Sequence, residues 1–337
     1  MTDATGPQGP PPPDAPRAAT LRRRVTPLRA AAGLAMMLLL AGVALATAST
    51  HAKPRHRPSC PGTCWIPSAR RAEPWQWELS NPLSVSSATL LGTNSKTYTR
   101  RRAAAPVVYD IDGIENTAFT VAALHRRHDH VICYIEVGAA GNYGDAYTTY
   151  YNEYKAAGVL GTQMPGYPEN YLNINSPKTV RIVETIIRNQ CAAKHFDAVE
   201  PDIDDSWYDS TGFPISLNDE VRYLRKLSGY AHSLGLAWGL KDGDQADPVS
   251  RSVTFIKDLI HYRVINFALT EQSFQYGTAS AIEPVFARAH LAWLDAEYDD
   301  QQSTVPPAKY CPYANRHNVN AVQFDSNLDG AWRVACR

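Results

Sequence analysis

Carboxylates or amides end six apolar, strand-like runs of this sequence: residues 107–112, 132–136, 198–204, 236–242, 264–272 and 291–297. An apolar run without polar alternation is typical of a strand buried on both faces. Clustered carboxylates raise one another's pKa values, so a fold gathers them mainly where chemistry or a cationic ligand uses them. Acids are also common where strand ends meet solvent, but six recurrences favour a functional site.

Two carboxyl groups held on different strand ends can hydrolyse a glycosidic bond. One group stays protonated and donates to the leaving oxygen, while an ionised second group attacks the sugar carbon or activates water. Asp202, with Glu200 on the same face of its strand, and Glu271 form the candidate pair. Because Glu271 follows an apolar run, we assign it the acid role. Retention or inversion depends on the spatial separation of the two groups, which the sequence leaves open.

The elements that must position these residues alternate along the chain. Eight strand candidates are separated by helix-like segments, such as residues 119–128, 179–194 and a helix from Ser216 to about Gly235. This pattern predicts an α/β fold, a (β/α)₈ TIM barrel with its active site at the carboxyl ends of the strands. The strand candidates are residues 75–79, 107–112, 132–138, 198–202, 236–241, 264–272, 291–297 and 321–324.

A long polar and aromatic stretch, residues 138–176, follows the third predicted strand. Such an elaborated loop in a compact domain is usually a lid or a binding loop. Its seven tyrosines either stack on a ligand or pack the insertion against the barrel, and the sequence leaves both uses open: Tyr143, Tyr147, Tyr150, Tyr151, Tyr154, Tyr167 and Tyr171.

The N-terminal part is predicted to lie outside the barrel. Residues 1–29 are rich in Pro, Ala and Arg and are expected to be disordered. Residues 30–52 contain an uninterrupted small or apolar run, 30–48, which is either a cleaved export signal or an uncleaved membrane anchor. Residues 53–73 are then a linker, and residues 74–337 are the barrel. Either interpretation of the run predicts a secreted or extracellular domain, attached to a membrane only if the run is retained.

Charge argues against a nucleic-acid partner. The chain has 33 basic and 33 acidic side chains, and the first 52 residues contain five Arg and two Asp, which leaves 28 basic and 31 acidic side chains beyond them. A slightly acidic domain lacks the basic face that a polyphosphate requires. No cofactor and no metal site is expected, because the Asp-rich segment 202–209 lacks the Gly and the final carboxylate of a calcium loop.

Six cysteines lie beyond the apolar run, and export makes disulfides the default expectation. Our guess among the 15 connectivities is Cys60–Cys64, Cys133–Cys191 and Cys311–Cys336. A zinc site at Cys60 and Cys64 is the rival interpretation, although no second pair of ligands follows at finger-like spacing.

Seven short motifs together resemble the endo-α-1,4-polygalactosaminidase family of glycoside hydrolases: WQWEL, VYDIDG, ICYIEVG, FDAVEPD, GLKD, FALTEQ and CPYAN. The resemblance runs from about Trp75 to Cys336, and it implies a secreted TIM-barrel enzyme with Asp202 and Glu271 as the catalytic pair. Other members have Asn where this chain has Ile203 and Thr270, and Cys is common where it has Ser273.

The resemblance also implies the substrate, a polysaccharide that contains galactosamine or N-acetylgalactosamine. An acidic mouth would attract its ammonium groups, and aromatic side chains could stack on it or form cation–π contacts. Trp238 is expected in the core instead. Two alternatives stay open, a glycan-binding barrel without activity and a hydrolase of another polysaccharide. The residues assigned to substrate binding are Trp77, Asp110, Asp112, Tyr134, Glu136, Glu200, Asp204, Lys241, Gln272 and Glu297.

Overall fold

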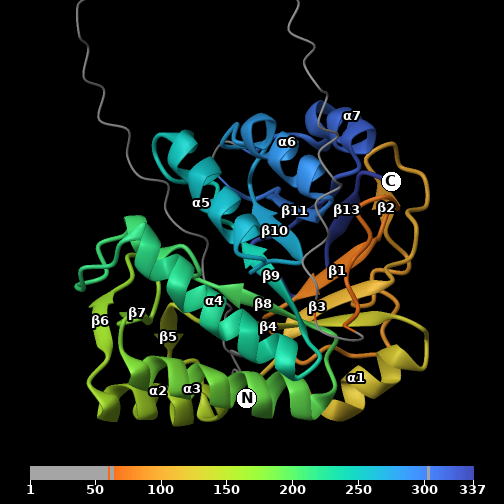
Figure 1. Ribbon diagram of the computed structural model, residues 1–337. Coiled ribbons are helices and arrows are strands. Elements are labelled where there is room, and N and C mark those ends of the chain that lie inside the picture. Colours follow the sequence, from red (N-terminus) through yellow and green to blue (C-terminus); the bar gives the residue numbers. More distant parts are fainter. Residues whose placement is uncertain (1–59, 61–63, 302–303) are drawn as a thin grey trace, which may run out of the picture. The chain divides into compact units, whose positions relative to one another are not determined.

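A curved parallel sheet surrounded by helices forms the centre of the protein (Figure 1). The computed structural model describes residue 60 and residues 64–301 and 304–337, so the predictions for residues 1–29 and 30–52 lie outside the described residues. Eight parallel strands follow one another in the order of the chain. They are β1 (Trp75–Glu78), β3 (Val108–Asp112), β4 (His130–Glu136), β8 (Ala198–Asp202), β9 (Ala237–Lys241), β10 (Phe267–Glu271), β11 (Ala292–Tyr298) and β12 (Asn320–Phe324).

Side chains close the ring between the last strand and the first. Beyond β12 the sheet continues through the antiparallel strand β13 (Arg333–Ala335) to β2 (Lys96–Thr97). The indole N–H of Trp75 on β1 donates to the carbonyl of Asn320 on β12 (2.7 Å), and Arg333 donates to the carbonyl of Trp75 (2.9 Å). The predicted TIM barrel is therefore confirmed, with a seam that is bridged by side chains in place of a strand ladder.

Helices lie outside the strands and run back between their ends (Figure 1). Helix α4 (Leu217–Ser233) begins with a capping box, in which the Ser216 hydroxyl accepts from the Asp219 N–H and Asp219 accepts from the Ser216 N–H. The helices are α1 (Ala118–His125), α2 (Asp145–Ala157), α3 (Pro177–Ile186), α4 (Leu217–Ser233), α5 (Val249–His261), α6 (Ala279–Ala289) and α7 (Pro307–His317). The segment predicted as one helix, 179–194, continues from α3 through a π-helical turn (Ile187–Cys191) and a 3₁₀ turn (Ala192–Lys194).

The predicted insertion between β4 and α3 folds as a unit with its own small sheet. It contains α2 and the antiparallel strands β5 (Ala139–Gly141), β6 (Leu160–Gln163) and β7 (Glu169–Leu172), in the order β5-β7-β6. It is attached to the segment after β8, because the backbone N–H of Thr162 donates to the carbonyl of Thr211 (3.0 Å). This insertion therefore stands beside the carboxyl ends of β4 and β8.

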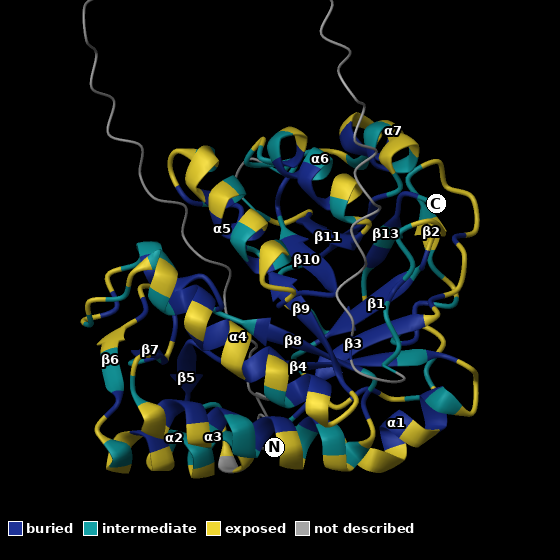
Figure 2. Cartoon of the chain, in the orientation of Figure 1, coloured by how far each residue is buried: buried dark blue, intermediate teal, exposed yellow. Residues whose placement is uncertain are grey.

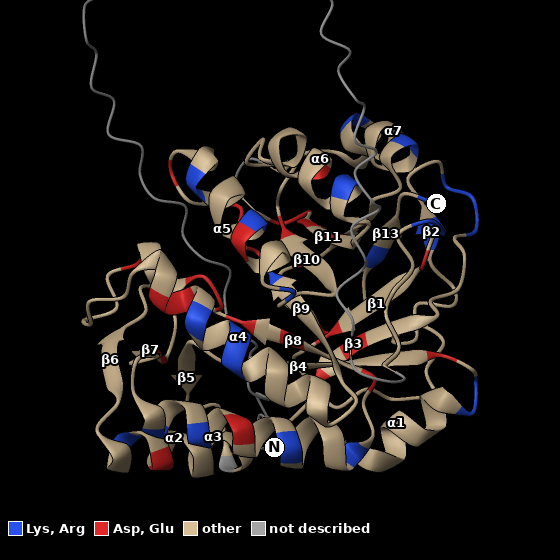
Figure 3. Ribbon diagram, in the orientation of Figure 1, with Lys and Arg blue, Asp and Glu red and all other residues tan. Residues whose placement is uncertain are grey.

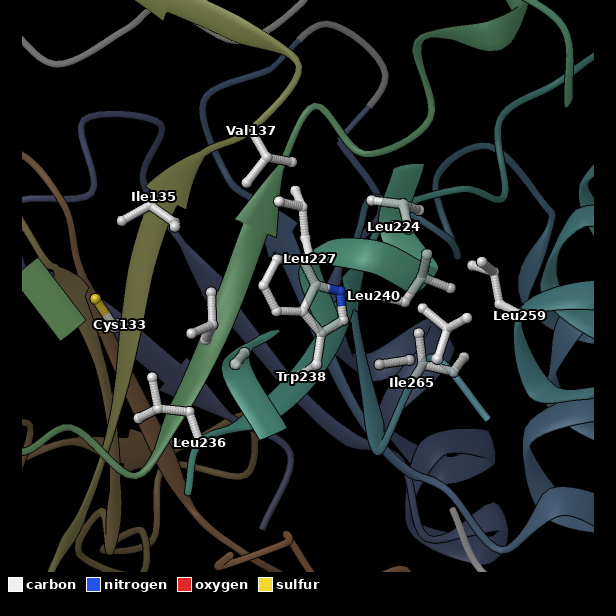
Figure 4. Packing of buried hydrophobic residues seen from close by; sticks show 14 of the residues in the cluster. Cys133, Ile135, Val137, Leu224, Leu227, Leu236, Trp238, Leu240, Leu259 and Ile265 are labelled. Atoms are coloured by element: carbon white, nitrogen blue, oxygen red, sulfur yellow. The ribbon is translucent and has the colours of Figure 1, made fainter. Parts of the chain in front are cut away.

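The central strands are almost entirely buried (Figure 2). Alternation along them separates two large apolar clusters, and a smaller third cluster of Ala139, Met164, Tyr167 and Tyr171 lies in the insertion. One cluster fills the barrel interior with residues such as Trp75, Ile132 and Phe267. The other lies between the strands and the helices, and there Trp238 of β9 packs among side chains of α4 such as Leu227 (Figure 4). Trp238 is thus a core residue, as the sequence predicted.

All three guessed disulfides are present: Cys60–Cys64, Cys133–Cys191 and Cys311–Cys336. The second joins β4 to the π-helical turn after α3, across 58 residues of sequence. The third joins α7 to the C-terminal segment after β13. The zinc interpretation of Cys60 and Cys64 is therefore wrong. Within the described residues, no helix is both long and apolar enough to cross a membrane.

Candidate active site

An acidic cleft of about 630 Å³, open to solvent, lies at the carboxyl ends of the strands. Four carboxyl groups and a single ammonium group line it, together with aromatic and apolar side chains. Figure 3 shows acidic residues on several central strands, whereas acidic and basic residues are mixed on the outer helices. The lining residues are Trp77, Leu79, Tyr134, Met164, Tyr167, Glu169, Asp202, Ile203, Lys241, Asp242, Glu271, Tyr298, Ser326 and Leu328.

Lys241, at the end of β9, joins the two predicted catalytic acids. Its Nζ lies 2.9 Å from Asp202 Oδ1 and 3.1 Å from Glu271 Oε2. Its side chain is only 5% exposed, whereas those of Asp202 and Glu271 are 16% and 13% exposed. Burial opposes its charge, but the surrounding carboxylates outweigh burial and raise the pKa of Lys241 well above its usual value. The cleft floor therefore carries a permanent positive charge between two carboxyl groups.

Asp202, the last residue of β8, is held in its ionised form. Burial favours its neutral form, but the Lys241 ammonium and the Tyr134 hydroxyl, which donates to Oδ2 (2.7 Å), outweigh burial. The pKa of Asp202 is consequently lower than usual. An ionised, partly exposed carboxylate at this place has the properties of a nucleophile or a general base.

Glu271, the last residue of β10, is held by hydrogen bonds at its backbone and at its carboxyl group. Its backbone N–H donates to Asp242 Oδ1 (2.6 Å), and the Tyr298 hydroxyl donates to its Oε1. Burial and the charge of Glu271 raise the pKa of Tyr298 well above its usual value, so that hydroxyl keeps its proton. Glu271 therefore shares Lys241 with Asp202 but has a different second donor.

A residue with left-handed backbone follows each of the three strands that supply these groups. Ile203 (φ 56°), Asp242 (φ 52°) and Gln272 (φ 58°) all have positive φ values. This conformation is unfavourable for side chains other than Gly, Asn and Asp, and most unusual for a β-branched residue such as Ile203. Each strand thus turns away sharply just after its functional residue, which leaves that side chain at the rim of the barrel.

Five of the predicted site residues line the cleft: Trp77, Tyr134, Asp202, Lys241 and Glu271. The Lys241 ammonium lies 5.4 Å from the centre of the Trp77 ring, so this indole forms a cation–π contact within the protein. Tyr134 donates to Asp202. Both aromatic residues therefore support the acids and the lysine from the cleft wall.

Four predicted substrate-binding acids are buried inside the barrel and do not line the cleft. Asp110 and Glu200 are completely buried, and Glu200 Oε1 lies 4.0 Å from Lys241 Nζ. Asp112 accepts from the Tyr147 hydroxyl, and Glu136 accepts from the backbone N–H of Gly141 (3.0 Å). We expected these acids at the mouth, but each lies within the barrel wall or beneath the insertion, where protein groups surround it.

The remaining three also do not line the cleft. Strand alternation explains this for Glu297 of β11 alone, because Asp204 and Gln272 lie beyond the ends of β8 and β10. Glu297 is on the same side of β11 as Trp293, and it accepts from the backbone N–H of Phe274 (2.8 Å). Asp204 accepts from the backbone N–H of Lys241 (3.2 Å), and Gln272 is 2% exposed. Tyr298, one residue beyond the predicted strand end, takes the place at the cleft that we expected for Glu297.

The sequence predicted a lid or a binding loop in the insertion but assigned none of its residues to the cleft. Met164, Tyr167 and Glu169 line it, and of these only Tyr167 belonged to the group of aromatic residues noted in the sequence. The acidic ends of strands gave the signal for Asp202 and Glu271, and β7 lies in a different sheet, so Glu169 carried no such signal. Asp242 ended one of the six runs but was not assigned a role.

Tyrosines of α2 hold the insertion together and attach it to the barrel. The hydroxyl of Tyr147 donates to Asp112 of β3, and that of Tyr150 accepts from Gln190 (2.6 Å) after α3. The hydroxyl of Tyr151 donates to Asn170 of β7 (3.2 Å), within the insertion. These residues, with Tyr154, surround a small cavity beside Glu136. For this group the packing interpretation holds, whereas Tyr167 faces the cleft.

Among the residues that the structure describes, no group of three or more His, Cys, Asp or Glu side chains is arranged to hold a metal ion. The basic partner inside the cleft is Lys241, which neutralises part of the acidic charge. What the arrangement can do chemically follows from its carboxyl groups. An ionised acid and a second acid share one ammonium group on the floor of an open cleft.

A parallel barrel with two carboxyl groups at its mouth is an architecture of glycoside hydrolases. Residues 57–337 match the sequence profile of Glycoside-hydrolase family GH114, and the chain belongs to this family. The motif resemblance to the endo-α-1,4-polygalactosaminidases is thereby confirmed, and the protein is a glycoside hydrolase.

Two solved structures are similar to this chain. The Aspergillus fumigatus protein Ega3, in complex with galactosamine, superposes with a TM-score of 0.64 at 24% sequence identity, over 82% of this chain and 99% of that one, and it shares the fold. The glycoside hydrolase domain of PelA from Pseudomonas aeruginosa has a TM-score of 0.48 at 10% identity, over 76% of this chain and 96% of that one. No curated protein matches the sequence.

Proposed function

We propose that this protein is an endo-acting glycoside hydrolase that cleaves α-1,4-linked galactosamine-containing polysaccharide, with Asp202 and Glu271 as its catalytic pair. The main observation in support is that Lys241 Nζ contacts both carboxyl groups, at 2.9 and 3.1 Å, on the floor of the open cleft. An endo-acting enzyme needs a cleft that a chain can cross, and this cleft is open to solvent.

The roles of the two acids follow from their surroundings. Asp202 attacks the sugar carbon, because Lys241 and Tyr134 keep it ionised. Glu271 donates its proton to the leaving oxygen and later accepts one from water. Lys241 is a positioning residue, since it holds both carboxyl groups in place and favours the charged form of Asp202.

The separation of the acids supports a retaining mechanism. Two oxygen atoms that contact the same nitrogen at 2.9 and 3.1 Å are separated by no more than the sum of these distances, about 6 Å. Retaining glycosidases place their carboxyl groups about 5–5.5 Å apart, and inverting ones about 6.5–9.5 Å apart to admit a water molecule. We therefore propose a covalent glycosyl intermediate on Asp202.

The galactosamine-containing substrate fits the charge of the cleft, where four carboxyl groups face one ammonium group. Such a cleft attracts a polymer that carries ammonium groups. The solved structure of Ega3 with galactosamine, which has the same fold, supports this choice. Secretion is part of the proposal, supported by the apolar run at residues 30–48 and by the three disulfides.

Incubation of the purified protein with partly deacetylated α-1,4-galactosaminan tests the proposal. We expect oligosaccharides of intermediate length, and NMR of the first product should show the α-anomer. Asp202→Asn and Glu271→Gln should each reduce turnover by about 100-fold or more with the fold preserved. A fully active variant of either acid would refute the pairing, and binding without cleavage by the unchanged protein would favour a glycan-binding barrel.

A further inference from the structure

Glu169 is a buried acid of the cleft without a cationic partner. It lies at the start of β7 in the insertion, is 4% exposed and lines the cleft with Asp202 and Lys241. Asp202, Asp242 and Glu271 each pair with Lys241. Among the described residues, no Lys, Arg or His lies within ion-pairing distance of Glu169.

One oxygen of Glu169 is also free to accept a ligand. The Tyr143 hydroxyl donates to Oε1, while Oε2 has no hydrogen-bond partner in the part of the chain that the structure describes. Burying an ionised carboxylate is costly unless a cation or hydrogen bonds compensate it. Burial, as the largest cause, accordingly raises the pKa of Glu169 to about 7 in the protein without a ligand. A ligand that brings a positive charge to this place would supply the missing partner.

The surroundings of Glu169 fit the rest of a sugar unit. Tyr167 lines the same cleft and is nearby in sequence, and Met164 donates its backbone N–H to the carbonyl of Glu169 (2.8 Å). An aromatic ring offers a face on which a sugar ring can stack. The Lys241 ammonium on the floor repels a second cation, so a substrate ammonium is directed away from the floor and toward the unpaired acid.

We propose that Glu169 binds the ammonium group of an unacetylated hexosamine unit and thereby selects the free amine over the acetamido group. The inference rests on the proposed function, because it assigns a recognition residue to the same cleft. It places substrate selection on the insertion, whereas the catalytic acids lie on the barrel strands. An N-acetylated unit carries no charge and gains nothing from this carboxylate.

Steady-state kinetics on matched oligosaccharides tests the assignment. The substrates are an α-1,4-galactosamine oligomer and its N-acetylated counterpart, and the variant is Glu169→Gln, which keeps the shape of the side chain. We expect kcat/KM for the amine substrate to fall about tenfold or more, mainly through KM, with little change for the N-acetylated substrate. Glu153→Gln, an exposed acid on α2 of the same insertion, is the matched control and should leave both values unchanged. An equal loss on both substrates, or no loss on the amine, would overturn the proposal.

A second variant separates recognition from structural support. Tyr143→Phe removes the hydrogen bond to Glu169 but keeps the charge, so it should retain the preference for the amine. If Tyr143→Phe lost the preference as completely as Glu169→Gln, the carboxylate would act only by holding Tyr143, and the proposal would fail.

Calorimetric measurement of binding tests the recognition role of Glu169 separately from the proposed hydrolase function. Galactosamine oligomer binding to the Glu271→Gln protein should weaken when Glu169→Gln is added, even if the unchanged protein hydrolyses nothing. Absence of hydrolysis with a Glu169-dependent preference for the amine would overturn the proposed function and leave the recognition site standing. Hydrolysis with an amine preference that does not depend on Glu169 would support the proposed function and overturn the recognition site.

Discussion

The carbonyl oxygen of Ile203 lies directly against Gly138, so that a Cβ atom at residue 138 would stand 1.9 Å from it. Gly138 begins the insertion, and Ile203 follows Asp202. The backbone N–H of Val137 also donates to the carbonyl of Asp202 (2.9 Å). The ends of β4 and β8 therefore approach each other closely beside the predicted nucleophile.

Gly138→Ala should reduce both stability and activity, because backbone atoms must move to admit the methyl group. We expect a loss of about 1–3 kcal/mol in the free energy of unfolding, measured with urea. The same shift would displace Asp202 and lower kcat. Gly229→Ala is the control, since a Cβ at Gly229 on α4 would meet no atom within 4 Å, and it should stabilise the helix by about 0.5–1 kcal/mol. A Gly138→Ala protein as stable as the unchanged one would show that the close approach is not required.

Ile203→Asn should stabilise the protein, although it replaces an apolar residue. Ile203 has a φ of 56°, a conformation that costs about 1–2 kcal/mol for most residues and that Asn tolerates. Ile203 is only partly buried, which limits the packing that is lost. Urea unfolding should therefore give the Ile203→Asn protein a higher free energy of unfolding than the unchanged protein. Ile203→Val, which keeps the β-branch, should give a lower free energy of unfolding than the unchanged protein. An Asn variant less stable than the Val variant would contradict the role of backbone strain.

Strand alternation explains which parts of the site could be predicted. The six acidic strand ends located the barrel mouth, and Asp202 and Glu271 do meet there. The sequence did not reveal which side of each strand faces the axis. In β11 the interior side carries Leu294 and Tyr298, so Glu297 points toward the helices. The extent of each strand also mattered, since β10 begins at Phe267 and the apolar residues before it are not part of the strand.

Long-range contacts account for what remained hidden. Glu169 reaches the cleft because an irregular insertion folds into a separate sheet, and no periodic pattern marked its strands. The seam between β1 and β12 depends on the contacts of Trp75 with Asn320 and Arg333, which lie 245 and 258 residues further along the chain. The sequence assigned Lys241 to substrate binding, whereas its contact with both catalytic candidates emerges only in the folded barrel.

Lys241→Met should shift the pH dependence of catalysis. Without the ammonium group, burial dominates and the pKa of Asp202 rises, so the acidic limb of kcat/KM moves to higher pH. Loss of a buried charge from this cluster should also lower the free energy of unfolding by about 3–5 kcal/mol at neutral pH. Lys226→Met, on the exposed face of α4, is the control and should change neither quantity. An unchanged acidic limb in a folded Lys241→Met protein would refute the electrostatic role.

Buried acids with raised pKa values should make the protein most stable at mildly acidic pH. Burial is the largest cause of the rise, to about 8 for Glu78, Glu220 and Asp295 and to about 9 for Glu297. In the unfolded chain such groups titrate near pH 4. Because the folded state holds these protons more tightly, their contribution is complete below about pH 4 and is lost as the pH rises through about 8–9. Asp202, with its lowered pKa, makes stability rise with pH instead, but it is one group against these four.

The Tm should therefore fall between pH 5 and pH 9. Glu220→Gln should flatten this fall, while Glu153→Gln should not. A Tm that rose over this range would show that these carboxyl groups are ionised in the folded protein.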